Sequence, residues 1–293
     1  MEKGFYTALG TPLDRDGHFL SESMERHVKQ QLDACASGLL VMGSMGNESY
    51  IKNGEYAKVA ACSAAAAGGK IPVLVGVTDV SIGRVTDRVD ALSGISGIDG
   101  IVTTVPYYST CTQEDIYTFY NEIAKKSPWP VYLYDLPVVT KTATLPATVQ
   151  KLWKNPNIKG IKSGNLVTQR VLSRSEDKPK DFALMFSNLD EFDIAYQYGI
   201  DKNLDGMFSC SPKTSQKLYQ ALATGNMAAA GTYLDQILLL RDLFLSTSQL
   251  MMAFSHAMNL LGCEGCFGRD YQRDISDADK ERVAFALKQL GEI

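Results

Sequence analysis

The stretch Ile-Lys-Gly-Ile-Lys-Ser-Gly at residues 158–164 is an apolar run that ends on a lysine between small residues. Its alternation predicts a β-strand in which Ile158, Gly160 and Lys162 share one face, because successive side chains of a strand point to opposite sides. One amine would then lie at the end of the inner face of the strand. We take Lys162 as the candidate nucleophile. The alternative is a lysine that ends a strand and extends into water, which is the usual place for this residue type.

Strand and helix patterns alternate on both sides of this stretch. Short apolar strands bounded by turn residues are predicted at 5–11, 39–42, 71–77, 100–104, 131–134, 158–164, 182–186 and 204–209. Helices are predicted at 21–36, 81–93, 113–126, 146–154, 166–174 and 190–198. A further helix, between the second and third strands, ends at residue 67, and another begins at about residue 213.

Eight strand-helix units in strict alternation predict an α/β fold, a closed parallel (β/α)8 TIM barrel over residues 1–224. A doubly wound open sheet is the alternative, but the uniform units and the absence of a dinucleotide glycine fingerprint favour closure. Residues 225–293 carry further helical patterns at 227–245 and 277–290. We expect a C-terminal helical extension that packs against the barrel or a sister subunit.

Composition excludes several classes of partner. The 29 Lys and Arg against 33 Asp and Glu give a formal charge of -4 without a basic block, so nucleic acid is not an expected partner. No window approaches 18 consecutive apolar residues, and residues 1–5 do not read as a leader peptide. We expect a protein of the cytoplasm without a membrane partner.

The residues that usually bind metals are scattered. Among the 6 cysteines only Cys263 and Cys266 have ligand-like spacing, and a single C-x-x-C favours a turn at a helix end. The 3 histidines do not lie at ligand spacing from one another. The sequence therefore predicts chemistry without a metal or cofactor.

Polar side chains gather where the predicted strands end. In a barrel of this kind chemistry occurs at the carboxyl ends of the strands. The candidates at these ends are Ser44, Tyr107, Tyr108, Tyr134, Lys162, Asp190, Glu191, Ser209 and Cys210.

A lysine in this largely apolar mouth would lose part of its preference for the ammonium form, which frees the amine to attack a ketone. Imine formation is then the natural reaction. The cationic nitrogen withdraws electrons from the carbon-carbon bond two atoms away, and a phenol within reach can carry protons. Tyr134, on the neighbouring strand and of inward parity, is the candidate for that role.

Two other groups suggest substrate contacts. The Ser44-Met45 turn offers a hydroxyl and backbone N–H groups at a strand-to-helix junction, which suits a carboxylate; a plain tight turn and a phosphate cradle are the alternatives. Asp190 and Glu191 would repel an anion and accept hydrogen bonds from hydroxyls, although acids at a helix start give the same pattern. Ser209, on the last strand, is a further candidate for substrate binding.

Four short motifs occur in the order of a known family. Gly43-Ser44-Met45-Gly46, Val105-Pro106-Tyr107-Tyr108, Tyr134-Asp135-Leu136-Pro137 and Gly160-Ile161-Lys162 together resemble the dihydrodipicolinate synthase and N-acetylneuraminate lyase family across nearly the whole chain. Arg269, after Gly268, is similar to a family position near the carboxyl terminus.

The resemblance implies a Schiff base between Lys162 and pyruvate, free or as the keto-acid end of a longer sugar acid. It implies Tyr134 as proton shuttle and the turn at Ser44 and Met45 as carboxylate holder. Tyr108 matches a tyrosine that in the synthases completes a proton relay across a subunit contact. The family also implies a homotetramer built as a dimer of dimers.

The departures from the family pattern bear on the substrate. The family's Gly-Thr-Thr-Gly-Glu is here Gly-Ser-Met-Gly-Asn, and Met45 cannot pass a proton. Val139 replaces the arginine that holds the aldehyde carboxylate in the synthases, and Asp135 stands where an asparagine is usual. Asp190 and Glu191 are similar to the sialic-acid lyase pair that binds the hydroxyl tail of the sugar.

We therefore expect a Schiff-base (class I) aldolase, a carbon-carbon lyase that cleaves or forms a 2-keto-3-deoxy sugar acid or sialic acid with pyruvate as one partner. One alternative is dihydrodipicolinate synthase, which condenses pyruvate with aspartate semialdehyde. The other is a barrel that binds a keto acid without catalysis.

Overall fold

Eight parallel strands form the centre of the molecule. The computed structural model describes residues 1–293. The strands pair in chain order into a closed barrel, and β1 pairs with β8 to close it. The fold class expected from the sequence is confirmed. The strands are β1 (Gly4–Ala8), β2 (Gly38–Val41), β3 (Val73–Gly76), β4 (Gly100–Thr104), β5 (Val131–Asp135), β6 (Ile158–Ser163), β7 (Ala183–Phe186) and β8 (Lys202–Asp205).

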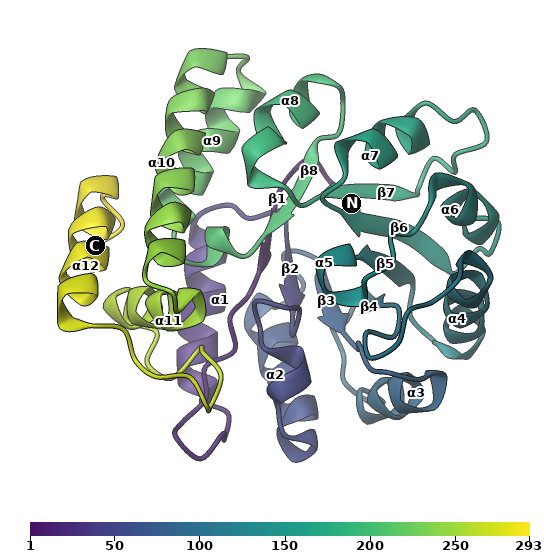
Figure 1. Ribbon diagram of the computed structural model, residues 1–293, viewed down its shortest axis with the longest axis horizontal. Helices are drawn as coiled ribbons and strands as arrows, with labels where there is room; N and C mark the ends of the chain where they lie inside the picture. The colour runs from purple at the N-terminus through teal and green to yellow at the C-terminus, as the bar shows by residue number, and fades with distance from the viewer.

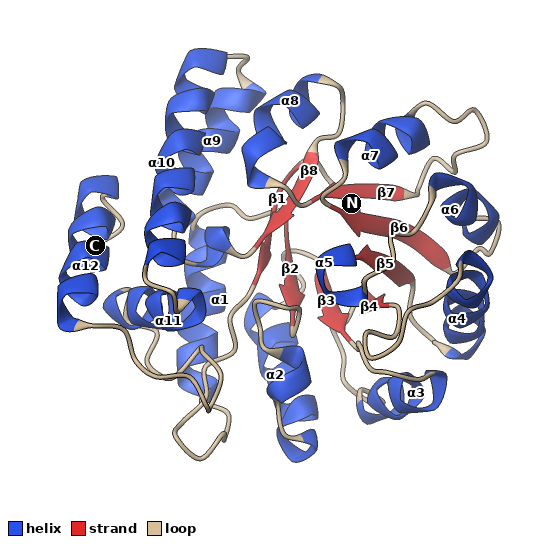
Figure 2. Ribbon diagram, viewed as in Figure 1, coloured by secondary structure: helices blue, strands red, loops and turns tan.

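Helices surround the strands, as Figure 1 and Figure 2 show. The helices of the barrel are α1 (Ser21–Asp33), α2 (Asn53–Ala67), α3 (Ile82–Ala91), α4 (Gln113–Lys126), α5 (Pro137–Thr140), α6 (Pro146–Leu152), α7 (Leu166–Ser173), α8 (Phe192–Gln197) and α9 (Pro212–Ala223). Short 3-10 turns lie at η1 (Glu48–Tyr50), η2 (Leu189–Glu191) and η3 (Met207–Ser209). None of the helices is long and apolar enough to cross a membrane.

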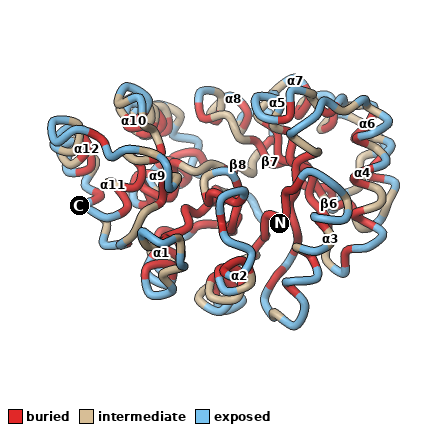
Figure 3. Tube along the Cα trace, turned by 60° about the horizontal axis from the view of Figure 1, so that its bottom comes forward, coloured by how far each residue is buried: buried red, intermediate tan, exposed pale blue.

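The interior of the barrel is filled by side chains from alternate strand positions, and Figure 3 shows the strands as buried. Tyr132 and Tyr134 belong to this inner layer, which confirms their inward parity. Gly160 lies opposite Tyr132, and a Cβ at this glycine would be 2.8 Å from the tyrosine ring and 2.6 Å from the carbonyl oxygen of Ala183. The glycine two residues before Lys162 is therefore required by packing.

The C-terminal extension consists of α10 (Met227–Ser246), α11 (Leu250–Leu260) and α12 (Asp277–Leu290). The sequence analysis did not predict α11. Side chains of the extension such as Phe244 and Phe254 share one apolar cluster with Phe5 and Phe208 of the barrel. The extension is thus continuous with the hydrophobic packing around the last strand-helix unit.

The last strand ends earlier than predicted. Asp205 Oδ1 accepts a hydrogen bond of 2.8 Å from the Met207 amide, and this side-chain turn at Gly206 ends β8 and begins η3. The prediction of a strand over 204–209 is wrong in this respect, so Ser209 does not lie at a strand end. Asp205 occupies that place instead.

Candidate active site

Lys162 lies on the inner face of β6, directly opposite Tyr134 on β5. It is only 7% exposed, and its Nζ lies 3.9 Å from the centre of the Tyr134 ring. Both side chains line a cavity of about 330 Å³ at the carboxyl end of the barrel. The other residues of this lysine pocket are Ala8, Ser44, Met45, Leu136, Ser187, Asn188, Leu189, Asp205, Gly206, Met207, Arg241 and Leu250.

A hydroxyl pair closes one side of the lysine pocket. Ser44 Oγ donates a hydrogen bond of 3.4 Å to the Tyr134 hydroxyl. Ser44 follows β2 and Tyr134 belongs to β5, so the barrel joins groups that lie 90 positions apart in the sequence. A nucleophile, a phenol and an alcohol are thereby in contact, which is an arrangement suited to imine formation and proton transfer.

The turn that carries Ser44 is anchored by Asn47, one of the departures from the family pattern. Asn47 has a φ of 53°, a left-handed conformation that asparagine adopts more readily than most residues. Its Nδ2 donates to the carbonyl oxygens of Phe267 (2.6 Å) and Gly268 (3.2 Å). The turn is therefore fixed to the segment that precedes Arg269.

Met45 forms a wall of the lysine pocket. A Cβ added to Gly206 would lie 2.7 Å from Met45 Cγ, so the methionine side chain covers this glycine closely. The substitution at this position thus replaces a hydroxyl with an apolar surface between the turn and β8.

Asp135 is engaged in structural contacts. Its Oδ1 accepts a hydrogen bond of 2.9 Å from the Thr144 amide, and its Oδ2 accepts one of 2.8 Å from Ser163 Oγ. Burial raises the pKa of this carboxyl, while the two hydrogen bonds oppose the shift. The side chain joins the end of β5 to β6 and to the loop that follows α5.

The acidic pair of η2 does not line the lysine pocket. Asp190 accepts two hydrogen bonds from Arg241 of α10, of 2.6 Å from Nη1 and 3.1 Å from Nη2. This contact lowers the pKa of Asp190. Glu191 lines a neighbouring cavity of about 490 Å³ beside Asp135. Arg241, which the sequence analysis did not select, lines the lysine pocket together with Asn188 and Leu189 of this region.

Two other candidates lie apart from the lysine. Tyr108 is 86% exposed after β4. Ser209 is fully buried, and its Oγ donates a hydrogen bond of 2.9 Å to the carbonyl oxygen of Ala8. Asp205, which sequence reasoning missed because β8 was placed too late, lines the pocket with Lys162. Burial raises the pKa of Asp205, and the charges of Lys162 and Arg241 oppose that shift.

Comparison with known proteins decides the family. The profile of the dihydrodipicolinate synthetase family matches residues 1–290. The chain belongs to the dihydrodipicolinate synthetase family. Family members are class I aldolases that use pyruvate, and this member is accordingly a carbon-carbon lyase of the Schiff-base type.

Two curated relatives of this family member match nearly its whole length. The 4-hydroxy-tetrahydrodipicolinate synthase of Kosmotoga olearia is 27% identical and that of Laribacter hongkongensis 28%, with 99% and 98% of both chains covered. Among solved structures, YagE from E. coli K12 in complex with pyruvate has a TM-score of 0.90 at 20% identity, and both chains are covered fully. CdNal from Clostridium difficile in complex with mannosamine has a TM-score of 0.89 at 17% identity, with 99% of each chain covered. These two likenesses concern the fold.

A second cavity of this family member, of about 210 Å³, adjoins the lysine pocket, and Ser44 and Leu136 line both. We call it the Arg269 chamber. Its other lining residues are Asn47, Glu48, Ser49, Tyr50, Thr78, Thr104, Tyr107, Val139 and Arg269.

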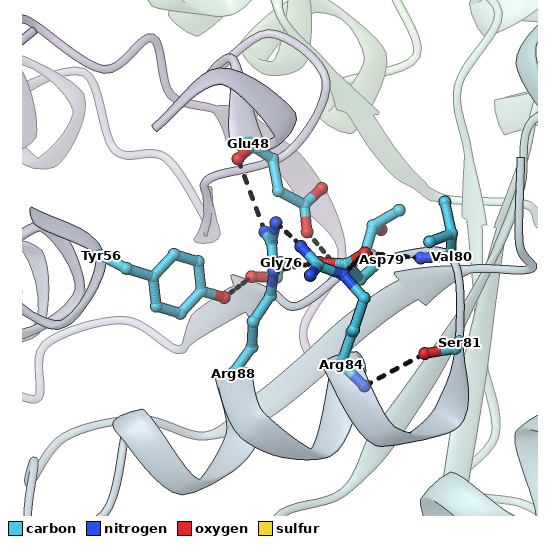
Figure 4. A network of polar contacts seen from close by, with 9 residues as sticks. Glu48, Tyr56, Gly76, Asp79, Val80, Ser81, Arg84 and Arg88 are labelled. Atoms are coloured by element: carbon cyan, nitrogen blue, oxygen red, sulfur yellow. Dashed lines mark hydrogen bonds and ion pairs between the residues drawn. The ribbon is translucent and has the colours of Figure 1, made fainter. Parts of the chain in front are cut away.

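A polar network around Asp79 adjoins the chamber through Glu48, which lines it (Figure 4). Asp79 accepts hydrogen bonds from Arg84 Nε (2.6 Å) and Arg88 Nε (3.1 Å), and Arg88 Nη1 donates to the carbonyl oxygen of Glu48 (3.5 Å). The Glu48 carboxyl accepts a hydrogen bond from the Thr78 amide. Burial nevertheless raises the pKa of Glu48 to about 8, so this acid carries a proton in the fully folded protein near neutral pH.

No three His, Cys, Asp or Glu side chains are grouped where they could hold a metal ion. Cys263 and Cys266 are free, and their Sγ atoms contact Gln30 Oε1 (3.4 Å) and the carbonyl oxygen of Gly268 (3.8 Å) respectively.

Proposed function

We propose that this family member cleaves or forms a 2-keto-3-deoxy sugar acid or a sialic acid through a Schiff base on Lys162. The observation that carries the proposal is the buried Lys162 amine 3.9 Å from the ring of Tyr134, whose hydroxyl contacts Ser44. A buried amine between apolar walls, with a phenol beside it, has the surroundings that nucleophilic catalysis needs.

In the cleavage direction the Lys162 nitrogen attacks the C2 carbonyl carbon of the keto acid, and the C2 oxygen leaves as water. The protonated imine then draws electrons from the C3–C4 bond. Tyr134, as phenolate, takes the proton of the C4 hydroxyl, the C3–C4 bond breaks, and the aldehyde leaves. Tyr134 returns a proton to C3 of the enamine, and water hydrolyses the imine to release pyruvate and the free amine.

Ser44 and Met45 are proposed to hold the keto-acid carboxylate through the Ser44 hydroxyl and the backbone N–H groups of the turn. Asp190 accepts two hydrogen bonds from Arg241, and its side chain is more than half exposed. We propose that Asp190 and Arg241 form hydrogen bonds with hydroxyl groups of the sugar at the rim of the lysine pocket. Glu191 and Ser209 are proposed to act only by shaping this side of the barrel.

Tyr108 is proposed to act at a contact between two subunits of a tetramer. Its 86% exposure leaves the tyrosine ring uncovered in the single chain, so a second copy of the chain has access to it. Sedimentation of the wild type and of Tyr108→Ser tests this role, because a subunit contact made by Tyr108 would weaken in the variant.

The direct test of the proposed function is the release of pyruvate from a panel of keto acids, measured with a coupled reductase. N-acetylneuraminate and 2-keto-3-deoxygluconate are the first substrates to try, and Lys162→Arg is the inactive control. Release of pyruvate from any panel member by the wild type alone supports the proposal. Failure with the whole panel would contradict it.

A second candidate function is the condensation of pyruvate with aspartate semialdehyde. It is favoured by the names of the curated relatives, which are 4-hydroxy-tetrahydrodipicolinate synthases. The apolar side chain of Val139 argues against it, because position 139 supplies no guanidinium where the synthases carry the arginine that holds the aldehyde carboxylate. A coupled assay in which aspartate semialdehyde is consumed faster than any sugar-derived aldehyde would favour this candidate.

A further inference from the structure

Arg269 is a cation without an anionic partner. It forms no ion pair with any Asp or Glu, and its Nε is buried without a hydrogen-bond partner. Its Cζ lies 5.1 Å from the centre of the Tyr50 ring, which is a cation-π contact and supplies no acceptor to the buried Nε–H. A partly buried guanidinium in this state favours the binding of an anion, because burial of an unpaired charge is unfavourable.

The Arg269 chamber contains no carboxylate that would neutralise this charge near neutral pH. Its one acid, Glu48, is buried, and its pKa of about 8 keeps it protonated. The amide of Asn47 is used by the Phe267 and Gly268 carbonyl groups. The remaining polar side chains that line the chamber carry hydroxyls, among them Ser49 and Tyr107. The chamber is therefore positively charged and rich in hydrogen-bond donors.

The chamber and the lysine pocket share one wall. Ser44 and Leu136 line both cavities, and Ser44 Oγ contacts the Tyr134 hydroxyl at 3.4 Å. The chamber is therefore the neighbouring cavity on the Ser44 side of Lys162 and Tyr134.

We propose that the Arg269 chamber binds an anionic group, a carboxylate or a phosphate, at the far end of the aldehyde partner; this inference rests on the aldolase function proposed above. Arg269 would bind the group with two parallel N–H donors, a geometry that the planar guanidinium provides and lysine does not. The preferred sugar acid then has a second anionic group, so that the aldehyde released from it is itself an acid or a phosphate ester.

The test compares aldehydes that differ in one anionic group, in condensation with pyruvate. The pairs are glyceraldehyde with glyceraldehyde 3-phosphate, and butanal with succinic semialdehyde. The variants are Arg269→Gln and, as matched control, Arg273→Gln, since Arg273 is exposed and forms no ion pair. We expect Arg269→Gln to raise KM about 10- to 100-fold for the anionic member of at least one pair, as charge-assisted hydrogen bonds allow. The KM values of Arg269→Gln for the neutral aldehydes should stay within about twofold of the wild type, and so should the KM values of Arg273→Gln for all four aldehydes.

Other outcomes would refute the inference. One is a wild type that prefers both neutral aldehydes, and another is an Arg269→Gln variant in which both members of each pair are affected equally. If Arg269→Gln also dissociates an oligomer in sedimentation, with no change in the preference for charge, a second copy of the chain fills the chamber.

Two further measurements separate this inference from the proposed function. Trapping of pyruvate with borohydride measures only imine formation on Lys162. We expect the amount of trapped pyruvate to be unchanged in Arg269→Gln. The thermal shift caused by inorganic phosphate reports the chamber without turnover, and we expect it to be smaller in Arg269→Gln than in the wild type. The anionic aldehyde, added together with phosphate, should reduce the thermal shift that phosphate causes. If it does not, phosphate binds at a separate site and the inference is refuted.

Discussion

Glu48 gives a quantitative test of the electrostatics at the Arg269 chamber. Burial raises its pKa from 4.5 to about 8. Between these two values the folded protein retains a proton on Glu48 that the unfolded chain has lost, so the free energy of unfolding falls as the pH rises. Glu48→Gln has no such proton. Its amide keeps an oxygen that can accept the hydrogen bond from the Thr78 amide.

The size of the effect follows from the pH interval. Each pH unit in this window corresponds to about 1.4 kcal/mol, so the interval of about 2.5 units from pH 4.5 to pH 7 corresponds to about 3 kcal/mol. We therefore expect Glu48→Gln to be more stable than the wild type by up to about 3 kcal/mol at pH 7, and of similar stability near pH 4.5. An unfolding entropy of roughly 2.1 cal/mol/K per residue converts this difference to about 5 °C in Tm for 293 residues.

The assay is urea or thermal unfolding of both proteins at half-unit steps from pH 4.5 to pH 8. Glu55→Gln is the matched control, because a hydrogen bond from Lys58 holds the pKa of Glu55 below its usual value. Glu55→Gln should be less stable than the wild type at neutral pH, and this difference should shrink as the pH falls through the pKa of Glu55. Parallel stability curves for Glu48→Gln and the wild type would refute the assignment of a raised pKa to Glu48.

Three further changes test the lysine pocket and the barrel. Tyr134→Phe should lower kcat for cleavage by about 10²- to 10⁴-fold, because it removes the proton carrier, while borohydride trapping of pyruvate persists; unchanged kcat would contradict the role. Asp205→Asn removes a buried carboxyl whose pKa the charge of Lys162 lowers, and the pH profile of pyruvate trapping should move to lower pH; an unmoved profile would show that Asp205 does not act on Lys162. Gly160→Ala should cost about 1–3 kcal/mol of stability from overpacking, whereas Gly83→Ala, with open space around it, should cost none; equal stability of the two variants would contradict the packing argument.

The barrel could be predicted from sequence because each strand-helix unit carries its own local pattern. The alternation that places Lys162 on the inner face of β6 also places Tyr134 on the inner face of β5, and parallel register then brings them opposite each other. The contact of a lysine with a phenol is thus a consequence of two local patterns and one rule of topology.

The rest of the pocket depends on contacts that no local pattern encodes. Arg241 reaches Asp190 from a helix 51 positions later, and Arg269 comes from the segment after α11. The true end of β8 depends on a side-chain hydrogen bond of Asp205, which an apolar run does not reveal. Sequence patterns therefore do not reveal that Asp190 is bound by Arg241 and that Glu191 lines a neighbouring cavity.

The most direct test of the account is the mass of the protein after incubation with pyruvate and borohydride, followed by peptide mapping. The account predicts one reduced pyruvate adduct on Lys162 in the wild type and in Lys159→Ala, whose residue lies on the same strand and pairs with Asp181, and none in Lys162→Ala. An unmodified wild-type protein, or an adduct that persists in Lys162→Ala, would contradict it.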